Sequence, residues 1–308
     1  MKPQRLEGLI AAPPTPMHAD GSVSPGMIEG QCRALAEAGV RGAFVCGTTG
    51  EGLSLTVPER MQVAEAWVTA AGEDLAVIVH AGHLSLAEGR ALAAHAQRIG
   101  ADAVAAMGPC FFKPDTVGDL VEFCAELASA APELPFYYYH IPAVSGVLFP
   151  MIEFLQCASG RIPTLAGMKY THEDLMDFGR CLRFQGGRHN MLFGRDEILL
   201  CALALGARGA VGTTYNFAAP LYLRIMRAFE AGDMATARED QARAMEMVAV
   251  LRTFGVTIAA KEAMKLTGLD CGPVRPPLRD LTGAESARLR DELDRAGFFD
   301  YASHAARA

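Results

Sequence analysis

One lysine stands where a buried strand is expected to end. Lys169 follows the apolar run Leu165-Ala166-Gly167-Met168, which is typical of a buried β-strand. Lysine is scarce in this chain, with five copies against twenty-three arginines. Burial lowers the pKa of an amine, and a neutral amine can attack a carbonyl carbon. Lys169 is therefore a candidate Schiff-base nucleophile. The alternative is a strand-end lysine whose amine reaches water.

A glycine-rich turn could bind the acidic end of a carbonyl substrate. It reads Gly47-Thr48-Thr49-Gly50-Glu51-Gly52 and follows the apolar run 43–46. Such a turn exposes backbone N–H groups and hydroxyls to a small anion, for example a carboxylate. The alternative is an ordinary turn in which the threonines cap the next helix. We interpret Glu51 as a residue of a first helical turn with a structural role.

Further polar residues stand in or shortly after two other apolar runs. Tyr139 lies in the run 136–140, and we expect it to move protons during imine formation and carbon–carbon bond change. Asp196 and Glu197 follow the run 191–193, and we expect them to accept hydrogen bonds from substrate hydroxyls. With Lys169 as nucleophile, this set predicts a site for a 2-oxo acid whose remaining chain carries hydroxyl groups.

The elements that position these residues form a regular series. Short apolar runs alternate with amphipathic stretches, which favours parallel strands joined by right-handed helical crossovers. The runs cover 8–12, 43–46, 76–81, 103–107, 136–140, 165–168, 191–193 and 210–212, and helices are expected at 25–38, 58–71, 86–99, 117–130 and 173–184. Eight such units predict an α/β fold, a (β/α)₈ TIM barrel, with an open doubly wound sheet as the competitor. The phosphate loop that would favour the open sheet is absent after the first run.

The pattern changes near residue 231. We predict a barrel over residues 1–230 that carries the site, and a C-terminal three-helix domain over residues 231–308. The helices are expected at 234–254, 257–266 and 284–296, and the proline-rich segment 271–278 should form a rigid connector. We expect Trp67 to lie in the core or an interface. Lys261 and Lys265 are expected on a solvated helix face or at a subunit contact.

Composition narrows the classes of function. The chain has 308 residues, 51% of them hydrophobic, and a formal net charge of −7. The absence of a basic run argues against nucleic-acid or anionic-membrane partners, and no stretch has the length of a membrane span.

The start of the sequence lacks the apolar core of a signal peptide, and the eight cysteines are scattered. We expect a cytoplasmic protein with a small-molecule substrate. No cofactor is expected. No metal is expected either, because His80 and His83 lack partner ligands nearby in the sequence.

The motifs resemble those of the pyruvate-dependent class I aldolase superfamily that contains dihydrodipicolinate synthase and N-acetylneuraminate lyase. The matching segments, in the family's order, are Gly47 to Glu51, Tyr139-x-x-Pro142, Gly167-Met168-Lys169 and Gly212-Thr213-Thr214-Tyr215-Asn216. The resemblance implies that Lys169 forms the Schiff base and Tyr139 transfers protons. It also implies that Thr48 and Thr49 bind the pyruvate carboxylate, and that the protein is a homotetramer.

Within this superfamily, the chain looks more like N-acetylneuraminate lyase than the synthase. Synthases carry an arginine two residues after the Tyr-x-x-Pro motif, where this chain has Val144. The resemblance to the lyase implies that five residues line the sugar site: Thr171, Gly194, Asp196, Glu197 and Thr213. The expected reaction is cleavage of N-acetylneuraminate to N-acetylmannosamine and pyruvate through a Lys169 imine.

Several residues depart from the lyase pattern and leave other substrates open. Thr48 and Thr213 stand where these lyases commonly have serine, and His140 replaces a more usual asparagine. The segment 110–112, Cys-Phe-Phe, replaces one in which synthases place a tyrosine of the neighbouring subunit. The alternatives are another 2-oxo acid aldolase, dehydratase or hydratase of the superfamily, or dihydrodipicolinate synthase. A non-enzymatic keto-acid sensor is the least favoured, because the chain retains both Lys169 and Tyr139.

Overall fold

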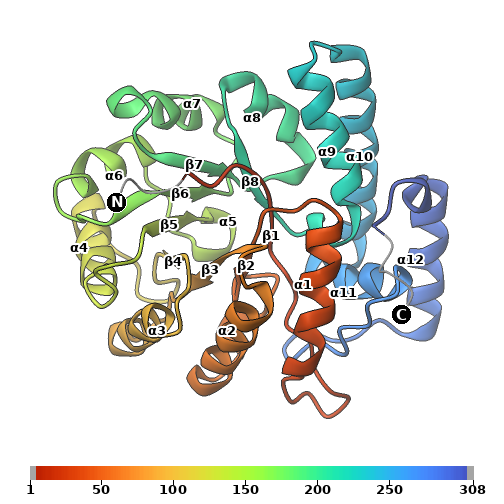
Figure 1. Cartoon of the computed structure of the whole chain (residues 1–308), viewed down its shortest axis with the longest axis horizontal. Coiled ribbons are helices and arrows are strands. Elements are labelled where there is room, and N and C mark those ends of the chain that lie inside the picture. Colours follow the sequence, from red (N-terminus) through yellow and green to blue (C-terminus); the bar gives the residue numbers. More distant parts are fainter. Residues whose placement is uncertain (1–4, 304–308) are drawn as a thin grey trace.

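A closed barrel of parallel strands forms the centre of the molecule. The computed structural model describes residues 5–303, and its strands follow one another around the barrel in chain order (Figure 1). The strands are β1 (Gly8–Ala11), β2 (Gly42–Val45), β3 (Ala76–His80), β4 (Ala103–Met107), β5 (Phe136–His140), β6 (Leu165–Tyr170), β7 (Asn190–Phe193) and β8 (Gly209–Gly212). β8 pairs with β1 and closes the ring. The predicted (β/α)₈ barrel is confirmed, and the open sheet is excluded.

The strands are apolar on both faces because each face is covered. Side chains such as Ile10, Phe44 and Ile78 fill the barrel interior, while their sequence neighbours face the surrounding helices. This accounts for the nearly continuous apolar runs in the sequence, since alternate residues point to opposite sides of a strand.

Helices surround the barrel and begin at residues suited to start them. Thr56 and Glu59 form a capping box at the start of α2, and Thr116 and Asp119 form one at the start of α4. The helices between strands are α1 (Ile28–Glu37), α2 (Val57–Ala71), α3 (Leu86–Arg98), α4 (Val117–Ala128), α5 (Pro142–Ser145), α6 (Met151–Ala158), α7 (Leu175–Arg183) and α8 (Leu199–Leu205). Trp67 of α2 is fully buried in the core between helices and strands.

The chain after β8 is helical. It forms α9 (Tyr215–Glu230), α10 (Met234–Phe254), α11 (Val256–Leu266) and α12 (Gly283–Arg295). The bounds of the last three agree with the sequence prediction to within one residue. α10 lies alongside α9 (Figure 1), and side chains of α10, α11 and α12 share one hydrophobic cluster with α1, α2 and α9. The helical region therefore packs directly on the barrel. The division at residue 230 stays a prediction, and its outer limits, residues 1 and 308, lie outside the described residues.

Within residues 5–303, no helix combines the length and the apolar character needed to cross a bilayer.

Candidate active site

Lys169 projects into the barrel near the carboxyl end of β6. The pairing of β5 with β6 shifts register between Phe136 and Tyr137. Gly167 lies at this irregularity, where a Cβ atom would stand 1.8 Å from the carbonyl oxygen of Asn190 on β7. Only glycine fits so close an approach of two backbones. The glycine two residues before Lys169 therefore allows the strand geometry that aims the lysine inward.

The amine of Lys169 lies between two aromatic rings. Its Nζ atom is 4.2 Å from the centroid of the Phe44 ring and 4.2 Å from that of Tyr139. The residue is 4% exposed. Burial lowers the pKa of Lys169 to about 7, and the nearby charge of Asp196 opposes that change. The amine is therefore available in its neutral form near neutral pH, and the alternative of a solvated strand-end lysine is wrong.

The Tyr139 ring, which contacts the amine of Lys169, carries a protonated hydroxyl. Its oxygen lies 3.2 Å from the hydroxyl oxygen of Thr48. Burial raises the pKa of Tyr139 to about 12, while the hydrogen bond with Thr48 acts in the opposite direction. The phenol therefore carries its proton near neutral pH. It can donate that proton to a reacting oxygen, and Thr48 can stabilise the resulting phenolate by a hydrogen bond.

The glycine-rich turn lies at the same end of the barrel. The hydroxyls of Thr49 and Thr213 are 2.7 Å apart, which joins the turn to the residues after β8. Within residues 5–303, the backbone N–H groups of Thr48 and Thr49 donate to no protein acceptor. Exposed N–H groups beside two hydroxyls suit a carboxylate. The structure thus brings together Lys169, Tyr139 and the turn, as the sequence predicted.

Gly194 and Thr171 lie against one another on the β6 and β7 side of the site. A Cβ atom at Gly194 would stand 2.0 Å from the hydroxyl oxygen of Thr171. This hydroxyl is buried and makes no hydrogen bond of normal geometry within residues 5–303, although it lies near enough to Tyr139 to act on the pKa of that phenol. A donor and acceptor of this kind is free to bind a substrate group.

Asp196 is buried and already holds part of the site in place. Its Oδ2 atom accepts hydrogen bonds from the backbone N–H of Thr214 at 3.0 Å and from the Thr214 hydroxyl at 2.6 Å. Burial raises the pKa of Asp196 to about 6, and the two bonds from Thr214 limit that rise. Besides any contact with substrate, Asp196 therefore fixes the segment that follows β8.

Glu197 is engaged by two arginines. Its carboxylate forms an ion pair with Arg195 at 3.4 Å and another with Arg252 of α10. Arg195 also pairs with Glu173. The sequence predicts that Glu197 accepts hydrogen bonds from substrate hydroxyls, and in the structure its Oε1 atom pairs with both guanidinium groups.

Two residues that contact Lys169 and Tyr139 were not predicted from the sequence. Phe44 lies under the amine of Lys169, and His80 packs edge-on against Tyr139 with ring centroids 5.8 Å apart. Burial lowers the pKa of His80 well below its usual value, so the ring is neutral. Its Nδ1 donates to the carbonyl of Cys46 at 3.2 Å, and its Nε2 accepts from the N–H of Met107 at 3.3 Å. Strand alternation places each of them on one of two faces, but it does not tell which face is inward, because both faces of these strands are buried.

Two of the sequence interpretations need correction. Glu51 is not in a first helical turn, because its backbone is left-handed with φ of 53°, and its carboxylate pairs with Lys261 at 2.8 Å. Lys261 is therefore not on a solvated face: its side chain is 5% exposed, whereas that of Lys265 is 56% exposed. The two lysines are four residues apart, so they lie on the same side of α11 and were predicted to share one environment. Lys261 is buried because Glu51, which is distant in sequence, packs against it.

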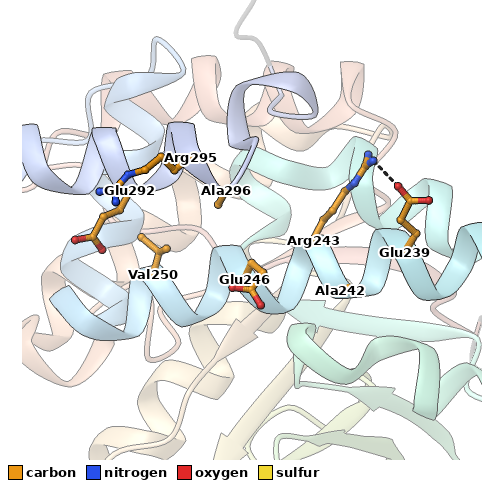
Figure 2. Close-up of a pocket in the computed structure, with 8 residues that line it drawn as sticks. All are labelled: Glu239, Ala242, Arg243, Glu246, Val250, Glu292, Arg295 and Ala296. Carbon is orange, nitrogen blue, oxygen red and sulfur yellow. Dashed lines mark hydrogen bonds and ion pairs between the residues drawn. The ribbon is translucent and has the colours of Figure 1, made fainter.

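A hollow on the outer surface offers no comparable chemistry. It lies between α10 and α12, has a volume of about 560 Å³, and is bordered by the Arg243–Glu239 ion pair (Figure 2). None of its lining residues belongs to the barrel strands. Among residues 5–303, no cluster of three or more His, Cys, Asp or Glu side chains is placed to hold a metal ion.

Comparison with known proteins identifies the family of the chain. The model of the dihydrodipicolinate synthetase family matches residues 5–296. The chain belongs to this family. It is 42% identical to the N-acetylneuraminate lyase of Homo sapiens, over 96% of this chain and 95% of the relative.

Solved structures of N-acetylneuraminate lyases are also similar to this chain. A Proteus mirabilis N-acetylneuraminate lyase is 45% identical, with a TM-score of 0.93 over 96% of this chain and 100% of that one. The Aliivibrio salmonicida N-acetylneuraminate lyase, or sialic acid aldolase, is 43% identical, with a TM-score of 0.93 over 96% and 98% of the two chains. The expected family resemblance is confirmed across nearly the whole chain.

Proposed function

We propose that this protein is a Schiff-base lyase that cleaves N-acetylneuraminate to N-acetylmannosamine and pyruvate. The observation that carries the proposal is the buried amine of Lys169, whose pKa burial lowers to about 7 and which contacts the ring of Tyr139, in a chain 42–45% identical to N-acetylneuraminate lyases. In this proposal the Lys169 amine adds to the C2 ketone of the open-chain sugar acid. Water then leaves and an imine forms.

The other residues of the site are assigned by their chemistry. Thr48, Thr49 and the N–H groups of their turn bind the substrate carboxylate. Tyr139 donates a proton to the departing hydroxyl, which leaves as water and gives the protonated imine, while Thr48 stabilises the resulting phenolate by a hydrogen bond. When the C3–C4 bond breaks, its electrons pass to the imine nitrogen, and the phenolate of Tyr139 takes the proton of the C4 hydroxyl. Protonation of the resulting enamine and hydrolysis then release pyruvate and restore Lys169.

The remaining predicted residues are assigned to the sugar side. We place Gly194 and the free hydroxyl of Thr171 against the polyhydroxyl chain. Asp196, Glu197 and Thr213 complete this side of the site, and Asp196 and Thr213 also hold the segment after β8 in register.

Release of pyruvate from N-acetylneuraminate tests the reaction. Wild-type protein should release pyruvate, Lys169→Ala should not, and the exposed-lysine control Lys265→Ala should behave as wild type. Reduction with borohydride in the presence of pyruvate should add a stable mass to Lys169. Trapping without cleavage of N-acetylneuraminate would instead indicate another 2-oxo acid substrate, which a panel of sugar acids would identify. Trapping that persists in Lys169→Ala would refute the assignment of the nucleophile.

We also propose that the chain assembles as a homotetramer. Loops at the catalytic end of the barrel expose large apolar side chains: Leu84 is 54% exposed, Phe111 73% and Phe112 84%. Exposed aromatic pairs of this kind are common at protein interfaces. Light scattering on the purified protein should give the mass of four chains, and Phe111→Ser with Phe112→Ser should lower it.

We propose a cytoplasmic location, which rests on the scattered cysteines of the sequence. Cell fractionation would test it.

A further inference from the structure

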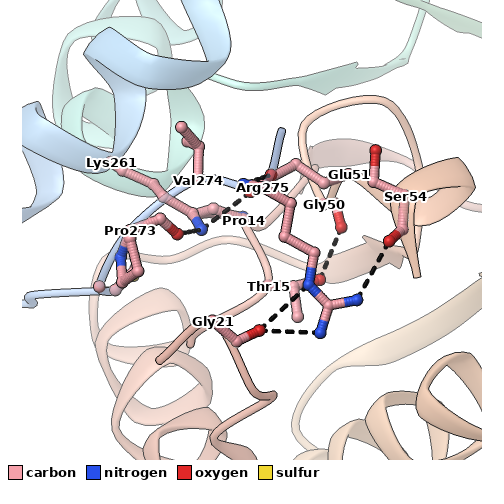
Figure 3. A network of polar contacts seen from close by, with 12 residues as sticks. Pro14, Thr15, Gly21, Gly50, Glu51, Ser54, Lys261, Pro273, Val274 and Arg275 are labelled. Carbon is pink, nitrogen blue, oxygen red and sulfur yellow. Dashed lines mark hydrogen bonds and ion pairs between the residues drawn. The ribbon is translucent and has the colours of Figure 1, made fainter. Parts of the chain in front are cut away.

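A buried ion pair joins the C-terminal helices to the substrate-binding turn. Nζ of Lys261 on α11 lies 2.8 Å from Oε1 of Glu51, and the two side chains are 5% and 2% exposed (Figure 3). Lys261 also donates to the carbonyl of Pro273 at 2.5 Å. Because Glu51 is enclosed and its carboxylate is directed at Lys261, it does not reach a ligand. Its influence on the site must pass through the backbone of the turn.

The connector between α11 and α12 adds a second tie to the same carboxylate. The backbone N–H of Arg275 donates to Oε2 of Glu51 at 2.8 Å. The Arg275 guanidinium donates to the carbonyls of Gly21 at 2.8 Å and Ser54 at 3.0 Å (Figure 3). It also pairs with Glu59. The Glu51 carboxylate thus contacts two parts of the C-terminal region, α11 through Lys261 and the connector through Arg275. The connector is in turn anchored to the loops around the turn.

The turn needs such support because its backbone is unusual. Cys46, just before it, has φ of 57°, and Glu51 has φ of 53°. Residues other than glycine seldom adopt these left-handed values, and they persist where surrounding contacts enforce them. A Cβ atom at Gly52 would stand 1.9 Å from the carbonyl oxygen of Cys46, so the turn is also tightly closed. The hydroxyl of Thr15 holds it further by donating to the carbonyl of Gly50 at 2.7 Å.

We infer that Glu51, Lys261 and Arg275 are positioning residues, through which the C-terminal helices hold the turn in the shape that binds the substrate carboxylate. This inference rests on the proposed function, because it requires a 2-oxo acid at Lys169. Lys261 has two effects: it fixes the turn, and it neutralises Glu51, whose negative charge would otherwise repel the substrate carboxylate. Loss of Lys261 should therefore weaken carboxylate binding more than loss of the Glu51 charge.

Selectivity for a charged ligand provides the test. Reductive trapping on Lys169 is measured over a range of pyruvate concentrations, and again with methyl pyruvate, which has the same ketone without the carboxylate. In Lys261→Met the half-saturating concentration of pyruvate should rise about tenfold, since an unpaired buried charge is costly and like charges repel. In the same variant, the half-saturating concentration of methyl pyruvate should change by no more than about twofold, because methyl pyruvate has no carboxylate. In Glu51→Gln the rise for pyruvate should be about threefold, because the amide keeps the bond from Arg275.

A matched control separates this role from general stability. Asp240 of α10 has a side chain only 5% exposed and pairs with Arg224 of α9 at 2.7 Å, away from the turn. Asp240→Asn should leave the preference for pyruvate over methyl pyruvate unchanged. The inference is overturned if Lys261→Met and Glu51→Gln both keep wild-type selectivity, or if Asp240→Asn alters it equally. Should Lys261→Met fail to fold, Glu51→Gln decides alone. A wild-type protein that is not trapped at all would refute the proposed function, and this inference with it.

Discussion

Raising the pH through 7 should convert Lys169 from an ammonium ion to a reactive amine. The side chain lies between the rings of Phe44 and Tyr139, and its burial lowers the pKa to about 7 from the ordinary value of 10.5. An ordinary amine with that higher pKa is neutral in only about 0.03% of molecules at pH 7, whereas a pKa of about 7 makes roughly half of them neutral. Burial therefore increases the concentration of nucleophile on the order of 10³-fold at this pH.

Trace labelling of amines would measure this titration directly. The protein is treated with a small amount of acetic anhydride at a series of pH values from about 5 to about 11, a range that spans both pKa values. Mass spectrometry then gives the relative labelling of Lys169 and Lys265. Lys265 serves as an internal control, because its side chain is 56% exposed and its ion pair with Asp270 raises its pKa. Labelling of Lys169 should reach half its maximum near pH 7, and labelling of Lys265 only at much higher pH.

A substitution at Asp196 provides a second test of what sets the pKa of Lys169. Its negative charge raises the pKa of Lys169, against the effect of burial. Asp196→Asn should therefore move the midpoint of Lys169 labelling to lower pH and leave that of Lys265 unchanged. A wild-type Lys169 midpoint close to that of Lys265 would refute the reasoning, because the amine would then be as well solvated as an exposed lysine.

Three further outcomes are expected. Tyr139→Phe should fold and bind pyruvate but lower the rate of N-acetylneuraminate cleavage by about 10²–10⁴-fold, as measured by steady-state pyruvate release; a near-normal rate would move the proton-transfer role elsewhere. Lys169→Met should raise the free energy of unfolding by about 2–5 kcal/mol below pH 7, because a charged lysine is disfavoured only in the folded state. This gain should shrink as the pH rises from about 7 to 10.5, where the folded lysine is neutral while the unfolded one is still charged, and a gain independent of pH in urea titrations would contradict it. Activity should survive prolonged dialysis against a chelator, because the imine accepts the electrons that a metal would otherwise stabilise; loss of activity that added zinc or magnesium restores would count against the imine mechanism.

The sequence predicted the barrel because its signal is local and repeated. Runs such as 103–107 and 136–140 coincide with β4 and β5, and the helix predicted at 234–254 coincides with α10. Strands that are buried on both faces need uninterrupted apolar residues, and helices that pack on a barrel need a periodic apolar face. Both patterns can therefore be recognised in short stretches of sequence. The sequence likewise marked the carboxyl ends of the strands, where Lys169, Tyr139 and the turn at 47–52 stand. These residues converge because all the strands point the same way.

Only the tertiary structure decided how each of those residues is held. Phe44 and His80 looked like ordinary strand residues, yet the closure of the barrel places one under the amine of Lys169 and the other against Tyr139. Helical spacing suggested that Lys261 was solvated, whereas the fold buries it against Glu51. The pKa of a lysine, and the partner of a buried charge, depend on groups brought together from distant parts of the chain. The sequence by itself therefore predicted the fold and a set of candidate site residues, whereas barrel closure and the packing of the C-terminal helices determined which groups surround those residues.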